Sequence, residues 1–145
     1  MHYQPQKNLL QNRIILVTGA SDGIGREAAL TYAEYGASVI LIGRNEEKLK
    51  GVAQEIEAAG GTLAAWYTLD LLTCTPEVCQ ELAQRISTRY PVLDGVLHNA
   101  GLLGDVCPMD EQDPDTWQQV MQVNVNGTFF LTQALLPLLL KSESG

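Results

Sequence analysis

Short apolar runs alternate with amphipathic stretches along most of this chain. Runs such as Ile14–Val17 contain no polar residue, which is typical of parallel strands buried on both faces. Between them, apolar residues recur at the spacing of helices that cover one face of a sheet. The pattern predicts strands at 13–18, 38–43, 63–69 and 93–98, helices at 24–35, 46–58 and 76–89, and a longer helical stretch from 114 to 141.

Helix start and stop signals agree with these bounds. Asn45, Thr75 and Asp113 are predicted N-caps, and a proline at the first helical position follows the last two. Gly36 stands where a glycine would end the first helix. Within the long helical stretch, an irregular joint is predicted at Asn124, Asn126 and Gly127.

Strands that alternate with helices require a parallel sheet with right-handed crossovers. The prediction is therefore an α/β fold: a doubly wound parallel sheet flanked by helices, with strand order 3-2-1-4. Residues 13–145 form this one domain, and residues 1–12 are expected to be an irregular arm that crosses the sheet edge. The carboxyl ends of the first and fourth strands then meet at the switch point, where ligands bind in such sheets.

Composition narrows the function classes. With 145 residues, 46% of them hydrophobic, the chain can form one domain with a real core. A net charge of −8 argues against nucleic acid and anionic membranes as partners. The longest apolar run, 134–140, contains Pro137 and is far shorter than the roughly 20 residues of a spanning helix. We expect its leucines to cover the sheet or to pack in a dimer.

The remaining composition indicates the cytoplasm. Residues 1–5 show neither the basic segment nor the apolar core of a secretory signal. Cys74, Cys79 and Cys107 lack the spacing of a zinc or Cys-x-x-Cys site, so we expect reduced thiols and no metal.

The most specific motif is a set of glycines directly after the first predicted strand. Gly19, Gly23 and Gly25 occupy the turn into the first helix. A helix N-terminus attracts anions through its free N–H groups and its dipole, and residues without side chains let a diphosphate approach the backbone. The motif predicts dinucleotide binding, and the alternative is a purely structural tight turn.

The spacing Gly-x-x-x-Gly-x-Gly, with Thr18 before it and Ile24 inside it, resembles the cofactor loop of the short-chain dehydrogenase/reductase (SDR) family. Three later segments resemble the family in the same order: Asp70-Leu71, Asn99-Ala100-Gly101 and Val123–Gly127. The resemblance covers the chain from Arg13 onward. It implies a Rossmann-like fold and an oxidoreductase that transfers a hydride between NADP(H) and a small-molecule carbonyl or alcohol substrate.

The resemblance also implies roles for single residues. Asp70 is expected to accept from the adenine amino group, or else to be an ordinary cap, and Leu71 to contribute backbone. Asn99 either holds the fourth strand or lies near the adenosine ribose. The full set of expected cofactor-binding residues is Thr18, Gly19, Ser21, Asp22, Gly23, Ile24, Gly25, Arg44, Asn45, Asp70, Leu71, Asn99, Ala100, Gly101 and Val123.

The choice of cofactor depends on the end of the second strand. NAD-selective members carry an acid there for the ribose hydroxyls, whereas this chain has Gly43 followed by Arg44. A guanidinium offers a 2′-phosphate a charge-assisted fork, so NADP is predicted in preference to NAD, with Asn45 as a second contact. Alternatively, Arg44 is a solvated turn residue. Asp22 departs from the pattern, because many NADP-using relatives have a basic residue there.

Only one member of the family's catalytic group has a counterpart in this sequence. Asn124 matches the helical asparagine, whose amide is thought to hold a water on a proton path. The family's Tyr-x-x-x-Lys is matched only by Tyr3 and Lys7, which precede the first strand and enclose Pro5.

We therefore expect the cofactor-binding half of a longer homo-oligomeric enzyme, cut short before a fifth strand and inactive alone. The alternative is a non-enzymatic NADP-binding or interaction module. A methyltransferase of similar topology fits less well, because its glycine loop has a different spacing.

Overall fold

The computed structural model describes residues 5–62 and 65–143. Its four strands form one parallel sheet in the order β3-β2-β1-β4, which confirms the predicted order. The strands are β1 (Ile14–Thr18), β2 (Ser38–Gly43), β3 (Ala65–Thr68) and β4 (Gly95–Leu97).

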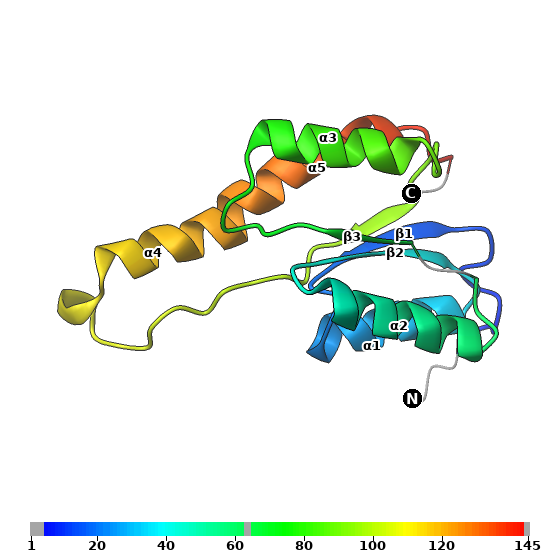
Figure 1. The fold of residues 1–145 in the computed structure, drawn as a ribbon, viewed down its shortest axis with the longest axis horizontal. Coiled ribbons are helices and arrows are strands. Elements are labelled where there is room, and N and C mark those ends of the chain that lie inside the picture. Colours follow the sequence, from blue (N-terminus) through cyan, green and yellow to red (C-terminus); the bar gives the residue numbers. More distant parts are fainter. Residues whose placement is uncertain (1–4, 63–64, 144–145) are drawn as a thin grey trace.

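Helices cover both faces of the sheet. In Figure 1, α1 (Gly23–Glu34) and α2 (Glu46–Ala58) lie on one face, and α3 (Pro76–Ser87) and α5 (Thr128–Leu139) lie on the other. Neighbouring residues of β1 serve the two layers: Leu16 packs in the core beside α3 and α5, and Val17 in the core beside α1 and α2. This two-sided burial explains the continuous apolar runs.

The predicted caps are confirmed. The side chains of Asn45, Thr75 and Asp113 each accept a hydrogen bond from a backbone N–H in the first turn of α2, α3 and α4 (Pro114–Met121), respectively. Gly36 follows α1 with a φ of 98°. The irregular joint is also confirmed: a π-turn, η2 (Gln122–Gly127), separates α4 from α5.

The structure differs from the prediction mainly at the fourth strand. β4 is shorter than 93–98, because the Leu93 N–H donates to the Leu138 carbonyl of α5 instead of joining the sheet. The described part of the N-terminal arm, 5–12, contacts the end of α1, where the Leu10 N–H donates to the Tyr35 carbonyl. Residues 63 and 64 of the predicted third strand, and 1–4 of the arm, lie outside the described residues.

The segment between β4 and α5 projects from the sheet. It contains a 3₁₀ turn, η1 (Met109–Glu111), followed by α4 and η2, and Figure 1 shows it extending well beyond the layers. We call residues 101–127 the arm-like projection. Neither η1 nor α4 has a buried residue, so this projection contributes little to the core.

Candidate functional site

The glycine loop, residues 19–25, joins β1 to α1 at the carboxyl end of the sheet. Its glycines have different structural roles. Gly23 has a φ of 52°, which favours glycine, and no atom lies within 4 Å of the position of a Cβ there. A Cβ on Gly25 would instead overlap with the Gly19 carbonyl and the Asn99 amide. Gly25 therefore permits close packing of helix and strand, whereas Gly23 keeps the approach to the helix N-terminus open.

Thr18 and Asn99 hold the ends of β1 and β4 together. The buried Thr18 hydroxyl oxygen accepts from the backbone N–H groups of Asn99 and Ala100, at 3.1 and 3.0 Å. The Asn99 amide nitrogen donates to the Thr18 carbonyl oxygen at 3.2 Å. The structure thus shows the strand-holding role of Asn99, and its contact with a ribose stays a prediction.

A cavity of about 930 Å³ opens at this end of the sheet. Most of the residues expected to bind cofactor line it: Thr18, Gly19, Ser21, Asp22, Arg44, Asn45, Asp70, Leu71, Asn99, Ala100, Gly101 and Val123. Of the other expected residues, Gly23, Ile24 and Gly25 lie in the first turn of α1, with the Ile24 side chain exposed. The prediction missed seven lining residues: Ile42, Gly43, Lys48, Leu69, Leu72, Leu102 and Gln119.

The loop after β3 forms one wall of the cavity. One carboxylate oxygen of Asp70 accepts from the Leu72 N–H at 3.0 Å, a local turn that fits the cap interpretation. The Leu71 side chain is buried, and its carbonyl accepts from the Gln122 amide at 3.2 Å. The loop is thereby fixed before any ligand binds, and the adenine contact of Asp70 stays a prediction.

The segment after β2 brings charged side chains to the cavity. Arg44 is exposed directly after β2, and Asn45 uses its side-chain oxygen to cap α2 through the Lys48 N–H at 3.0 Å. The Lys48 ammonium donates to Asp22 at 2.8 Å, and the Gly23 N–H donates to the same carboxylate at 2.9 Å. These two hydrogen bonds keep the pKa of Asp22 below its ordinary value, so it is ionised at neutral pH.

Lys48 of α2 thus places a basic group beside position 22, where this chain has an acid. The sequence held a signal for it, since Lys48 lies three residues after the predicted N-cap Asn45 and hence near the end of β2. Its pairing with Asp22, 26 positions away, depends on how α2 packs beside the glycine loop.

Asn124 is engaged with the backbone at the base of the projection. Its side-chain oxygen accepts from the Leu102 N–H and its nitrogen donates to the Leu102 carbonyl, both at 2.8 Å. This paired geometry differs from the expected water-holding amide, because the backbone of Leu102 takes both ends of the side chain. The π-turn directs Asn124 to this loop.

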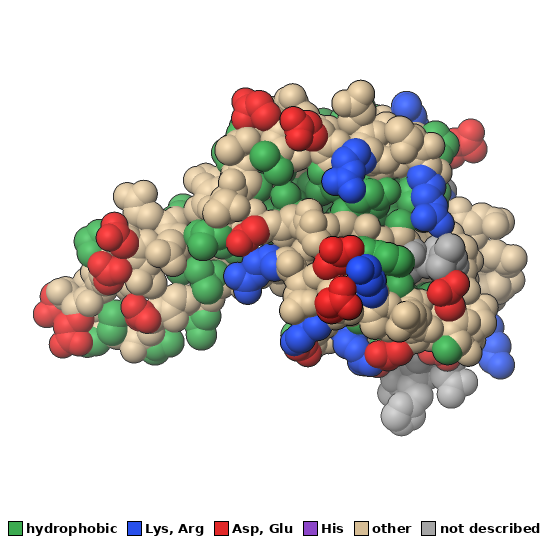
Figure 2. Space-filling view, in the orientation of Figure 1, with side chains coloured by type: hydrophobic (Ala, Val, Ile, Leu, Met, Phe, Trp, Pro, Cys, Tyr) green, Lys and Arg blue, Asp and Glu red, His purple; other side chains and the backbone are tan. Residues whose placement is uncertain are grey.

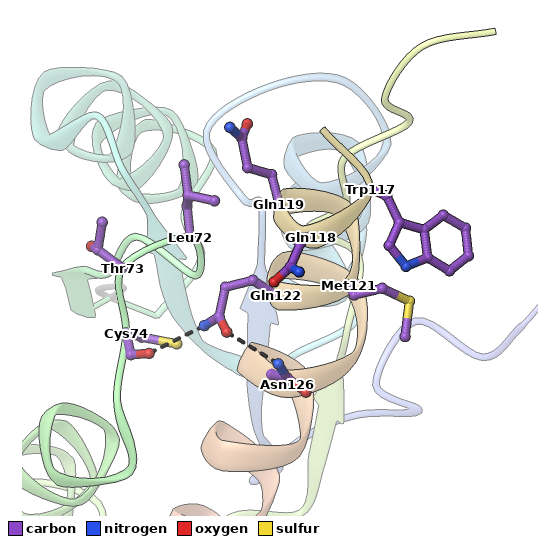
Figure 3. A pocket seen from close by; sticks show the side chains of 9 residues that line it. All are labelled: Leu72, Thr73, Cys74, Trp117, Gln118, Gln119, Met121, Gln122 and Asn126. Carbon is purple, nitrogen blue, oxygen red and sulfur yellow. Dashed lines mark hydrogen bonds between the residues drawn. The ribbon is translucent and has the colours of Figure 1, made fainter. Parts of the chain in front are cut away.

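The same π-turn directs Gln122 to the loop after β3. Figure 3 shows the Gln122 amide between the Cys74 backbone and Asn126, and it donates to the carbonyls of both Leu71 and Cys74 at 3.2 Å. These groups line a second cavity of about 660 Å³. The amides of Gln122 and Asn126 in this cavity are bonded to one another, and Gln122 also to the backbone. These hydrogen bonds hold the loop after β3 in place and leave the two amides less available to a ligand.

The three cysteines differ in their burial. Cys74 and Cys79 are buried and Cys107 is exposed, and none forms a disulfide. Burial raises the pKa of Cys79 to about 12, which leaves its thiol protonated. Within the described ranges, no three His, Cys, Asp or Glu side chains are grouped to hold a metal ion. None of the helices in the described chain is long and apolar enough to cross a membrane.

Comparisons with known proteins agree with this geometry. Residues 13–145 match the sequence profile of the short chain dehydrogenase family. The chain is 73% identical over 145 residues to the uncharacterised oxidoreductase YciK of Escherichia coli, which is all of this chain and 58% of YciK. The chain therefore spans less than two thirds of that relative's length.

Two similar solved structures contain cofactor. A short chain dehydrogenase from Escherichia coli, complexed with NADPH, has a TM-score of 0.95 at 73% identity, with 97% of this chain and 59% of that chain covered. A short chain dehydrogenase from Shigella flexneri, complexed with NADP, has a TM-score of 0.94 at 71% identity, with the same coverage.

Proposed function

Because this chain belongs to the short chain dehydrogenase family, we propose that it binds NADP(H) in the cavity at the carboxyl ends of its strands. The observation that carries the proposal is the glycine loop, which leaves open space at Gly23, in the first turn of α1, beside a cavity of about 930 Å³. The dinucleotide diphosphate fits the first turn of α1, where free N–H groups and the dipole favour an anion.

Arg44 supports the choice of NADP over NAD. Gly43 places no carboxylate at the end of β2, the position where an acid would bind the ribose hydroxyls of NAD. The Arg44 guanidinium lines the cavity directly after it and can form two parallel hydrogen bonds to a phosphate. The two similar structures that contain NADPH and NADP support the same choice.

We assign the protein an oxidoreductase reaction, hydride transfer between NADP(H) and a small carbonyl or alcohol substrate. In that reaction Asn124 acts through the backbone of Leu102, whose position at the cavity wall it fixes. Because both ends of its amide are bonded, we give Asn124 this positioning role instead of the water-holding role that the resemblance implies.

We further propose that the protein is a cytoplasmic homo-oligomer. Trp117, Val125 and Phe129 are 54%, 48% and 58% exposed on the helical segments of 114–139, and apolar side chains of this kind are typical of an interface. Free cysteines fit a reducing compartment. Light scattering on purified protein tests the oligomer, and a monomer at micromolar concentration would contradict it.

A pair of glycine variants tests cofactor binding. Gly23 and Gly60 both have positive φ and open space around a Cβ, but only Gly23 lies beside the cavity. Gly23→Val and Gly60→Val therefore carry similar backbone strain, and thermal melting should show similar stability losses. NADPH titration by fluorescence should weaken more than about tenfold for Gly23→Val only, since the branched side chain enters the diphosphate's place. Equal affinity of the two folded variants would contradict the proposal.

A further inference from the structure

Two cations, Arg44 and Lys48, line the cavity. Arg44 forms no ion pair with any other described residue. Lys48 lines the cavity as well, but its ammonium is bound to Asp22 at 2.8 Å. This ion pair joins the first turn of α2 to the glycine loop.

The ion pair between Lys48 and Asp22 can open so that Lys48 binds another anion. The side chains of Lys48 and Asp22 are 55% and 75% exposed, and an ion pair this open to water contributes little stability. Asp22 also caps α1 through the Gly23 N–H, so it keeps a role when Lys48 leaves. Lys48 can therefore turn to another anion at small cost.

Because the molecule is negatively charged, a second cation near the site would favour the binding of an anionic cofactor. The chain carries a net charge of −8, and Figure 2 shows acidic and basic side chains intermixed over the α1 and α2 layer. NADP is itself a polyanion, so its binding has to overcome this field. A carboxylate beside the site adds to the repulsion unless a cation neutralises it.

Resting on the proposed function, we propose that Lys48 is a second specificity-determining residue for the 2′-phosphate and that Asp22 competes with the phosphate for it. The flat guanidinium of Arg44 binds two phosphate oxygens, and the Lys48 ammonium binds the group as a compact charge. Asp22 lowers the affinity for NADP in proportion to how strongly it retains Lys48.

Lys50 provides a matched control. It lies on the same helix two residues further along, pairs with Glu46 and Glu47, and does not line the cavity. Lys48→Ala and Lys50→Ala therefore change the net charge equally. Titrating both variants with NADPH and NADH at one ionic strength should show NADPH weakened about three- to tenfold in Lys48→Ala only, with NADH within about twofold.

Asp22→Asn tests the competition, since asparagine also caps helices. It should tighten NADPH about two- to fivefold relative to NADH, and the gain should vanish in the double variant with Lys48→Ala. Equal weakening of NADPH in Lys48→Ala and Lys50→Ala would overturn the proposal, as would equal weakening of NADPH and NADH. So would a gain in Asp22→Asn that survives without Lys48. A wild-type protein without preference for NADPH would instead refute the proposed cofactor itself.

Discussion

The sheet end of the cavity and the arm-like projection are built in different ways. Around Thr18, Asn99 and Gly25, polar groups are paired inside a packed core, and Figure 1 shows this end flanked by helices on both faces. The projection has a single buried residue among the described ones, Gly127, and Figure 2 shows hydrophobic and acidic side chains on its surface. A few side-chain bonds to backbone, chiefly from Asn124 and Gln122, hold its base.

This difference indicates which part of the site is preformed. Local stability follows buried contacts, so the sheet end should keep its geometry without ligand, whereas the projection should open readily. Cofactor recognition then depends on the rigid end. The projection supplies a wall of the cavity, and the Gln122 amide bonds it to the loop after β3.

The largest loss of stability at the sheet end is expected from adding one methyl group at Gly25. Gly25→Ala should destabilise the protein by about 3 kcal/mol, because the Cβ meets backbone that cannot move aside. Gly51→Ala is the control, since Gly51 lies within α2 with open space around a Cβ and should gain about 0.5–1 kcal/mol. Urea denaturation measures both. Similar values for the two variants would show that the loop is not tightly packed.

Removing a charge from the rigid end should change binding without changing the fold. Arg44→Ala should weaken NADPH about ten- to a hundredfold and NADH far less, because a hydrogen bond to a charged group is lost. The difference should shrink at high salt, since the side chain is exposed. Fluorescence titration at two salt concentrations measures it. If both cofactors weaken alike, Arg44 does not contact the phosphate.

The opposite end of the sheet provides a pH test. Burial raises the pKa of Asp94, but hydrogen bonds from Ser142, the Ile14 N–H and Arg13 outweigh it and leave the pKa below its ordinary value. A lowered folded-state pKa contributes stability above the unfolded pKa of about 4, and this stability is lost as the pH falls through the folded pKa.

Asp94→Asn should therefore cost about 1 kcal/mol at pH 7 and flatten the loss of stability in acid. Urea denaturation from pH 7 to pH 3 compares the two proteins. An unchanged acid profile in the variant would contradict this role of Asp94.

The smallest global effect is expected in the projection. Asn124→Ala removes two bonds to the exposed Leu102 backbone, so hydrogen exchange should accelerate at residues 101–107 and stay unchanged in β1 and β4. Asn126→Ala is the control, because its amide donates only to the Gln122 side chain at 3.2 Å. Faster exchange throughout the sheet would show that the two regions are one cooperative unit.

The sequence was most informative where local chemistry decides the structure. Ser38–Gly43 and Glu46–Ala58 match the predicted bounds, because the apolar run, the turn after it and the Asn45 cap mark these ends in the local sequence. The shortened β4 could not be foreseen, since the Leu93 N–H bonds to α5, 45 positions away (Leu138).

In the candidate site, too, local motifs could be predicted and contacts between distant residues could not. The glycine loop and most lining residues were found from motifs, whereas the pairing of Lys48 with Asp22 and of Gln122 with the loop after β3 arises from helix packing. The irregularity near Asn124 was expected, but its π geometry could not be predicted from the residue types. This geometry turns Asn124 and Gln122 toward two different loops.

We propose above that the rigid carboxyl end of the sheet is a preformed site for NADP. The most direct test is to titrate the wild-type protein with NADPH and NADH under identical conditions. NADPH should bind at least about tenfold more tightly, as one charge-assisted contact to the 2′-phosphate requires. Equal affinities, or binding of neither cofactor by the folded protein, would contradict it.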